Sequence, residues 1–160
     1  MQRIGREEIG RVDWLIDDAL PVLARIFIVW IFPFSFIDKI INWNGALKQA
    51  TSSWLPGGPV LLVLAMIVEL CTPPMIVFGF YDGIAAFVLA GYCAVTGLVY
   101  HAFWGYPRFW SPESQGYPHI WDFFKNFALV GGLIYVMYDA GFIQTVGSDI
   151  DQVSMLRGLR

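Results

Sequence analysis

The sequence is poor in charge, cysteine and histidine, and each shortage excludes a class of protein. Only 14% of its 160 residues are charged, against about 25% in an average soluble domain. The net charge of -3 leaves no basic excess for nucleic-acid binding. The two cysteines, Cys71 and Cys93, lie inside long apolar runs, so the chain has no disulfide framework and no zinc-finger spacing. No glycine-rich phosphate loop, nucleophile elbow or carboxylate dyad supports a kinase or a hydrolase.

Apolar residues, in contrast, are abundant. Hydrophobic residues make up 57% of the chain and aromatic residues 17%. A soluble core of this size could not bury so many apolar side chains without leaving large exposed patches. A disordered chain would be polar and poor in aromatics. The composition therefore indicates that membrane lipid is the main solvent of this protein.

Four apolar runs are long enough to cross a bilayer, which takes roughly 20 residues per helix. Transmembrane strands would instead appear as alternating segments of about 10 residues. We therefore predict an all-α integral membrane protein, in which residues 19–143 form a bundle of four transmembrane helices. The expected helices are Ala19–Asn42, Pro59–Phe80, Gly83–Trp104 and Ile120–Phe142.

The remaining segments flank or connect these runs. In residues 1–18, apolar residues at helical spacing alternate with charges, which predicts an amphipathic helix lying on the membrane surface. Between the first two runs, Asn44 is expected to cap a short helix. Residues 144–160 form a polar C-terminal tail. Arginines are concentrated near both ends of the chain, and this bias predicts that both termini are cytoplasmic.

Five of the seven tryptophans fall at or near the outer face in this topology. One interpretation is an interfacial aromatic belt, since amphipathic rings favour the level of the lipid headgroups. The other is a surface for a partner subunit or a flat ring ligand. The length of the 105–119 connection slightly favours the second interpretation. The candidate residues for that surface are Trp54, Trp104, Trp110 and Trp121.

Glu69 is the most informative single residue, because it lies about 15 Å into the second helix, near the middle of the bilayer. A carboxyl at this depth is costly unless it is paired or hydrated. It either handles a proton or binds a ligand, or it pins helices together through one strong interaction. The candidate partners are Lys39, at the end of the first helix, and Lys125 with Asn126, in the fourth.

His101, near the outer end of the third helix, is a candidate for hydrogen bonding or proton transfer. The only other histidine, His119, is expected just before the fourth helix, and we therefore predict no metal site. Cys71 and Cys93 fall at similar depths. Burial disfavours a thiolate in hydrocarbon, so packing explains them better than a redox pair does.

Seven short motifs follow one another along the chain: Ala24-Arg25-Ile26, Lys39, Pro56-Gly57, Glu69, Phe78-Gly79, Tyr100-His101, and Lys125-Asn126 followed by Gly131-Gly132. Their order resembles that of the DoxX family of small four-helix bacterial membrane proteins, over roughly residues 20–140. The resemblance implies a bacterial inner-membrane location and a role near membrane redox chemistry. Relatives include a subunit similar to that of thiosulfate:quinone oxidoreductases, and others act in membrane oxidoreductase assemblies or in oxidative-stress defence.

Two hypotheses follow. In the first, the protein is a membrane subunit associated with quinone-linked electron transfer. Its candidate ligand and proton site is then Glu69, Lys39, His101, Lys125 and Asn126, and its ligand is a quinone or a lipid. In the second, the protein is a non-catalytic accessory or anchor subunit that stabilises a larger membrane assembly, and Glu69 is structural.

Overall fold

The structure is a computed structural model that describes residues 12–158 of the chain. Within this range all of the regular secondary structure is helical. Its elements, in chain order, are η1 (Leu15–Ala19), α2 (Leu20–Val29), α3 (Ile31–Ile41), α4 (Trp43–Thr51), α5 (Gly58–Phe78), α6 (Asp82–Tyr100), η2 (Phe103–Gly105), α7 (Gly116–Asp139) and α8 (Phe142–Gly158).

Four helices are long and apolar enough to cross a membrane, which confirms the predicted four-helix bundle. The first runs from Val12 to Ile41 and comprises η1, α2 and α3; the others are built on α5, α6 and α7. The surface helix predicted over residues 1–18 lies mostly outside the described residues. From Val12 onward the chain is helical and continues directly into the first spanning helix.

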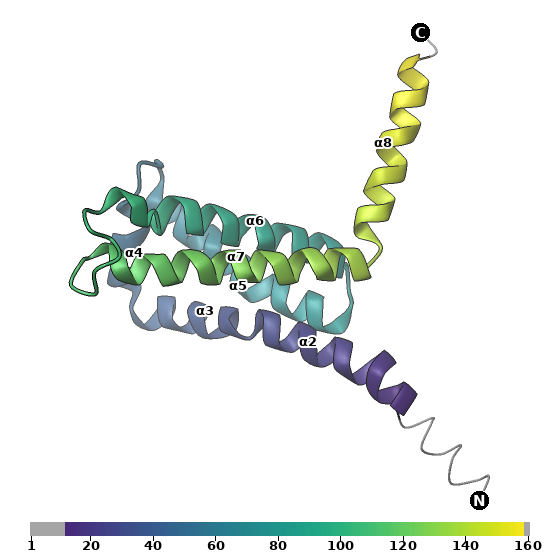
Figure 1. Cartoon of the computed structure of the whole chain (residues 1–160), viewed down its shortest axis with the longest axis horizontal. Helices are drawn as coiled ribbons and strands as arrows, with labels where there is room; N and C mark the ends of the chain where they lie inside the picture. The colour runs from purple at the N-terminus through teal and green to yellow at the C-terminus, as the bar shows by residue number, and fades with distance from the viewer. Residues whose placement is uncertain (1–11, 159–160) are drawn as a thin grey trace, which may run out of the picture.

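Several boundaries differ from the sequence-based expectation; α6, for example, ends at Tyr100 and not at Trp104. The short helix α4 exists, but it begins at Trp43 with Asn42 before it, so Asn44 lies inside the helix and does not cap it. The fourth spanning helix begins at Gly116, four residues earlier than expected, which brings His119 into α7. The polar tail forms α8, which leaves the bundle at a steep angle (Figure 1).

The bundle has two different ends, which we call the α4 end and the α8 end after the helices found there (Figure 1). α6 packs between α5 and α7, and α5 packs against α3. α2 contacts α7, where Ile28 lies against Gly132, whereas within residues 12–158 α3 makes no comparable contact with α7. The bundle is therefore closed in the half nearer α8 and less tightly closed in the half nearer α4.

The core lies where α5, α6 and α7 meet, and Val29 of α2 and Phe32 of α3 also belong to it. Its largest fully buried apolar side chains include Ile76, Leu89 and Leu133. Many other large apolar side chains, such as Phe27 and Ile41, are exposed all around the bundle. Such a surface would aggregate in water but is compatible with contact to lipid tails. The distribution of apolar residues thus agrees with four membrane-spanning helices.

An arginine holds three helices together near the α8 end. The Nη2 atom of Arg25 on α2 lies 3.0 Å from Asp82 Oδ2, at the start of α6, and 2.9 Å from Asp139 Oδ2, at the end of α7. The side chain of Arg25 is only 17% exposed. One guanidinium therefore pairs with two carboxylates from helices that are distant in sequence.

We expect the substitution Arg25→Ala to lower the free energy of unfolding by about 1–3 kcal/mol, because two carboxylates lose the guanidinium with which they are paired. Arg25→Lys should recover only part of this loss, since an ammonium is a point charge without the planar fork of the guanidinium. The measurement is unfolding in detergent, followed by circular dichroism. Equal stability of Arg25→Ala and the wild type would contradict a stabilising role.

Candidate functional site

A pocket of about 770 Å³ lies where α3 and α7 fail to close against each other. Its walls come from α3, α4, α5, α6 and α7. All five residues that the sequence analysis selected as a ligand or proton site line this one pocket: Lys39, Glu69, His101, Lys125 and Asn126.

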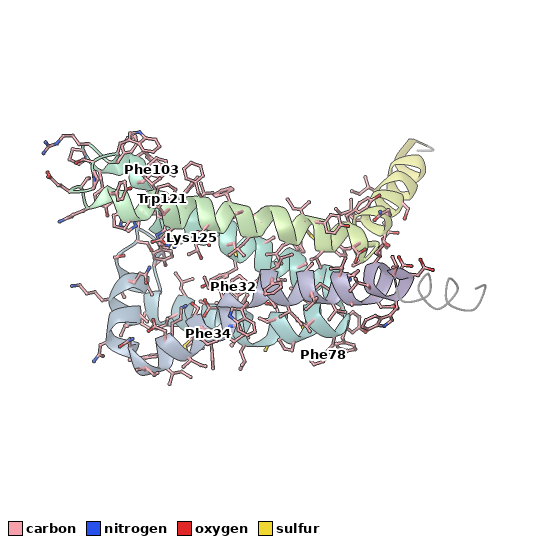
Figure 2. All side chains as sticks on the ribbon, turned by 60° about the horizontal axis from the view of Figure 1, so that its bottom comes forward. Phe32, Phe34, Phe78, Phe103, Trp121 and Lys125 are labelled. Atoms are coloured by element: carbon pink, nitrogen blue, oxygen red, sulfur yellow. The ribbon has the colours of Figure 1, made fainter. Side chains whose placement is uncertain are left out.

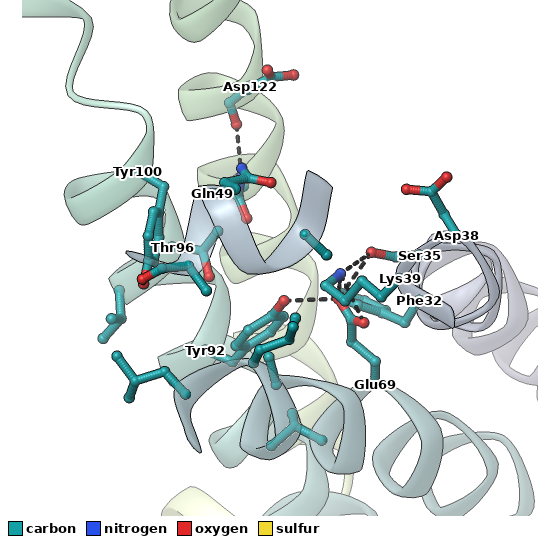
Figure 3. Close-up of a pocket in the computed structure, with 18 of the residues that line it drawn as sticks. Phe32, Ser35, Asp38, Lys39, Gln49, Glu69, Tyr92, Thr96, Tyr100 and Asp122 are labelled. Atoms are coloured by element: carbon teal, nitrogen blue, oxygen red, sulfur yellow. Dashed lines mark hydrogen bonds and ion pairs between the residues drawn. The ribbon is translucent and has the colours of Figure 1, made fainter. Parts of the chain in front are cut away.

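The deepest polar feature of the pocket is a network around Glu69, which we call the Glu69 network (Ser35, Lys39, Glu69 and Tyr92). Lys39 Nζ donates to Glu69 Oε1 at 2.8 Å and to Oε2 at 3.0 Å. Ser35 Oγ and Tyr92 Oη also donate to Oε1, at 2.9 and 2.7 Å. Figure 3 shows these three side chains converging on the Glu69 carboxylate. The side chain of Glu69 is only 2% exposed, so the carboxylate is buried and fully hydrogen-bonded.

The sequence places these groups at one depth by simple helical spacing. Ser35 and Lys39 are four residues apart on α3, so their side chains share one face, and Lys39 Nζ also donates to Ser35 Oγ at 2.6 Å. Glu69 lies near the middle of α5 and Tyr92 near the middle of α6. Phe32, one turn before Ser35, covers Tyr92 with its ring at a centroid distance of 6.5 Å. Three helices thus contribute to one hydrogen-bonded unit.

Lys125 and Asn126 line the pocket but do not reach Glu69. The side chain of Lys125 is 64% exposed, and its Nζ lies 2.7 Å from Asp122 Oδ1, one turn earlier on α7. Asn126 Nδ2 donates to the backbone oxygen of Asp122 at 2.8 Å. Of the two lysines considered as partners of Glu69, the structure therefore pairs Lys39 with it and holds Lys125 at the α4 end.

His101 lies at the end of α6, close to residues of α7. Its Nδ1 atom is 3.2 Å from His119 Nδ1 and 3.7 Å from Asp122 Oδ2. We call these three residues the His101 cluster. Since nine residues separate Tyr92 from His101 along the chain, the Glu69 network and the His101 cluster lie about 13 Å apart along the helix axis. The pocket thus has polar groups at two depths.

The predicted tryptophan surface is separate from the pocket. None of its four members lines the pocket, and each is more than half exposed. Figure 2 shows Trp121 and Phe103 together at the α4 end, beside Lys125. Phe103 is the centre of an aromatic cluster there, with Trp104, Phe109, Phe123 and Phe124 at centroid distances of 5.2–6.3 Å. The four tryptophans are Trp54, Trp104, Trp110 and Trp121.

Sequence reasoning missed several polar residues of the site. Ser35 could have been found from its spacing of four residues before Lys39 on one helix face. Tyr92 carries a weaker signal, as a hydroxyl in the middle of an apolar run, at a depth similar to that of Glu69. Asp122 and His119 became candidates only once α7 was seen to include both.

A family model, DoxX, matches residues 20–102 of the chain, which is just over half of its length. The chain belongs to the DoxX family. The matched region ends after α6, so it includes Lys39, Glu69 and His101 but not Lys125 and Asn126. The DoxX match therefore covers the buried ion pair, while α7 lies beyond it.

The chain is also similar to the inner membrane protein YphA of Escherichia coli (strain K12), with 24% identity over 115 residues. This alignment covers 72% of the chain and 79% of YphA. No solved structure matches the chain. An inner-membrane relative and four apolar helices together support a multi-pass protein of the inner membrane.

Proposed function

We propose that this DoxX protein is a membrane subunit that binds a quinone-type ring ligand in the pocket between α3 and α7, within an oxidoreductase assembly. The observation that carries the proposal is a buried, fully paired carboxylate at the inner wall of a large pocket in the membrane-spanning part of the bundle. Ionisable groups at this depth are costly and usually mark a ligand or proton path. A purely structural tie between helices would not require a pocket beside it.

The pocket suits an amphipathic ring ligand in size and in chemistry. Ligand pockets usually measure roughly 300–1,000 Å³ and combine apolar walls with a few polar groups, and this one measures about 770 Å³. Leu62, Val68 and Leu129 contribute apolar wall, and the Glu69 network and the His101 cluster contribute polar groups. A quinone, when bound, carries electrons and protons between membrane enzymes.

Each residue of the Glu69 network has a distinct role in this proposal. Lys39 holds the negative charge of Glu69 and presents an ammonium group to the pocket. Tyr92 and Ser35 donate to the same carboxylate oxygen, so a proton can pass between the pocket and Glu69 along existing hydrogen bonds. The chain supplies binding and proton transfer, and a partner subunit supplies the electrons.

Ligand entry follows from the incomplete closure of the bundle. α2 closes against α7 through Ile28 and Gly132. In the other half of the bundle, α3 and α7 line the pocket from opposite sides. A hydrophobic ring ligand dissolved in the bilayer can therefore enter sideways, between two lipid-facing helices, without crossing water.

The test uses the full chain in lipid nanodiscs and decylubiquinone as the probe. We expect one saturable site by isothermal titration calorimetry. Ala65→Phe, which fills the pocket from α5, should abolish binding. Glu69→Gln should weaken it by about tenfold, because Lys39, which presents its ammonium to the pocket, loses the charge-assisted hydrogen bonds that hold it in place.

The matched control is Glu113→Gln, the same substitution in the exposed 106–115 connection, and it should leave binding unchanged. Thermal unfolding of each variant verifies that the bundle is folded. Binding that is not saturable, or that persists unchanged in Ala65→Phe, would contradict the proposal.

A second candidate function, a non-catalytic accessory or anchor subunit, is favoured by the surfaces outside the pocket. α8 leaves the bundle (Figure 1), and the four tryptophans are exposed at the opposite end. This function predicts that a larger complex co-purifies in mild detergent and is lost when residues 105–115 are shortened. A solitary, monodisperse chain would count against it.

A further inference from the structure

The His101 cluster places two imidazole nitrogens and a carboxylate oxygen around one point. His101 comes from the end of α6, and His119 and Asp122 come from the first turns of α7. The ligand atoms of the three residues all lie within 4.8 Å of one another. The cluster is partly buried, with the side chain of His101 only 12% exposed. The DoxX match ends at residue 102. It therefore includes His101 but not His119 and Asp122, so the matched region does not contain the complete cluster.

We propose that His101, His119 and Asp122 bind a divalent first-row transition-metal cation of the Zn²⁺ type. Two neutral imidazoles and one carboxylate form a donor set typical of such cations. In a tetrahedral zinc site the ligand atoms lie about 3.3 Å apart, given zinc–nitrogen bonds of about 2.0 Å. The two Nδ1 atoms are 3.2 Å apart, and Asp122 Oδ2 is 3.7 Å from His101 Nδ1. The ligand atoms of His119 and Asp122 lie within 4.8 Å of each other, so side-chain rotations that draw this pair together would close the site.

The surroundings of the cluster orient its ligands. Tyr106 stacks on the ring of His119, with a centroid distance of 5.2 Å and an angle of 16° between the planes. Lys125 holds Asp122 through Oδ1, which leaves Oδ2 facing His101. Metal-binding side chains are commonly fixed by such outer contacts. Tyr106 and Lys125 are therefore positioning residues for the cation ligands.

The local fold of the chain explains why His119 is available. Gly116 lets the 106–115 connection pack onto the start of α7, since a Cβ atom there would lie 2.7 Å from Tyr106 Cβ. The helix then begins early enough for His119 and Asp122, three residues apart, to share one face. His101 and Asp122 also line the pocket, so the cation lies at its edge. The site itself does not depend on what fills the pocket.

The experiment is metal binding by the full chain, purified in mild detergent with an affinity tag that contains no histidine and then stripped with a chelator. We expect titration calorimetry with ZnCl₂ to give one Zn²⁺ per chain, and bound zinc to raise the melting temperature. His119→Gln and Asp122→Asn should each weaken Zn²⁺ binding by at least about tenfold and abolish the thermal shift. Substituting Co²⁺ should give the visible absorption of a nitrogen and oxygen site.

The control is Glu113→Gln, which removes an exposed carboxylate of the 106–115 connection that is not a ligand, and it should leave Zn²⁺ binding unchanged. Circular dichroism of each variant separates loss of the site from loss of the fold. The proposal is overturned if the wild type binds no stoichiometric Zn²⁺, or if binding survives both ligand substitutions. A Co²⁺ spectrum with a thiolate band would also overturn it, since it would place the metal on Cys71 or Cys93.

Discussion

Replacing Lys39 with methionine is expected to lower the free energy of unfolding by about 3–5 kcal/mol, the cost of leaving one partner of a buried ion pair uncompensated. The carboxylate of Glu69 is 2% exposed and takes two of its four hydrogen bonds from Lys39 Nζ. Methionine fills a similar volume, so the loss reports charge and hydrogen bonding more than packing. The measurement is equilibrium unfolding in mixed micelles with increasing dodecyl sulfate, followed by circular dichroism.

The double variant Lys39→Met/Glu69→Gln should regain most of that stability. A neutral amide in place of the carboxylate removes the unpaired charge, while Ser35 and Tyr92 can still donate to its oxygen. Comparing the double variant with each single one isolates the coupling between the two residues. Lys48→Met, the same change at an exposed position of α4, should stay within about 0.5 kcal/mol of the wild type. If Lys39→Met behaves like Lys48→Met, the ion pair does not stabilise the bundle.

The four-helix bundle could be predicted from the sequence because its signal is local. A run of about 20 apolar residues is sufficient evidence for a spanning helix, and all four runs correspond to one. The start of the first helix was less visible, since Asp13, Asp17 and Asp18 make that stretch resemble a surface segment. The backbone nevertheless continues unbroken from Val12, because no proline or glycine interrupts it before Pro21.

The sequence also predicts too late a start for α7, for a related reason. Residues 116–118, Gly-Tyr-Pro, resemble a connection. Proline is tolerated in the first turn of a helix, where the missing N–H would have no partner within the helix. The helix therefore includes Pro118, and with it His119. The expectation that His119 precedes the fourth helix depends on this boundary, whereas the prediction of no metal site depends also on the chain's having only two histidines.

The contacts within the site could be predicted only in part. The sequence indicates how deep a residue lies along its helix, but not how that helix is rotated about its axis toward its neighbours. Both Lys39 and Lys125 were compatible with Glu69 when depth along the helix was the only criterion. Their roles differ because α3 packs directly against α5, whereas Lys125 leans toward Asp122 on its own helix. Tyr92 was missed for the same reason, since an isolated tyrosine in an apolar run does not reveal which neighbour it faces. Such choices depend on how neighbouring helices are rotated about their axes.

The core that fixes these rotations should be sensitive to cavities. We expect Leu89→Ala to lower the free energy of unfolding by about 2–5 kcal/mol, because its fully buried side chain leaves a cavity among α5, α6 and α7. Leu98→Ala is the matched control, with the same substitution on the same helix at a side chain that is 51% exposed. Lipid tails can occupy the space that this smaller side chain vacates, so its effect should stay within about 0.5 kcal/mol.

The same pair of variants also separates the core from the pocket. Leu89 does not line the pocket, so Leu89→Ala protein that remains folded should bind decylubiquinone as the wild type does. Unfolding in mixed micelles gives the stability difference, and calorimetry below the unfolding transition gives the affinity. Equal losses of stability in Leu89→Ala and Leu98→Ala would mean that packing among α5, α6 and α7 does not hold the bundle together. A loss of affinity in folded Leu89→Ala would mean that the rotation of α6, which carries both Tyr92 and His101, depends on this one buried leucine.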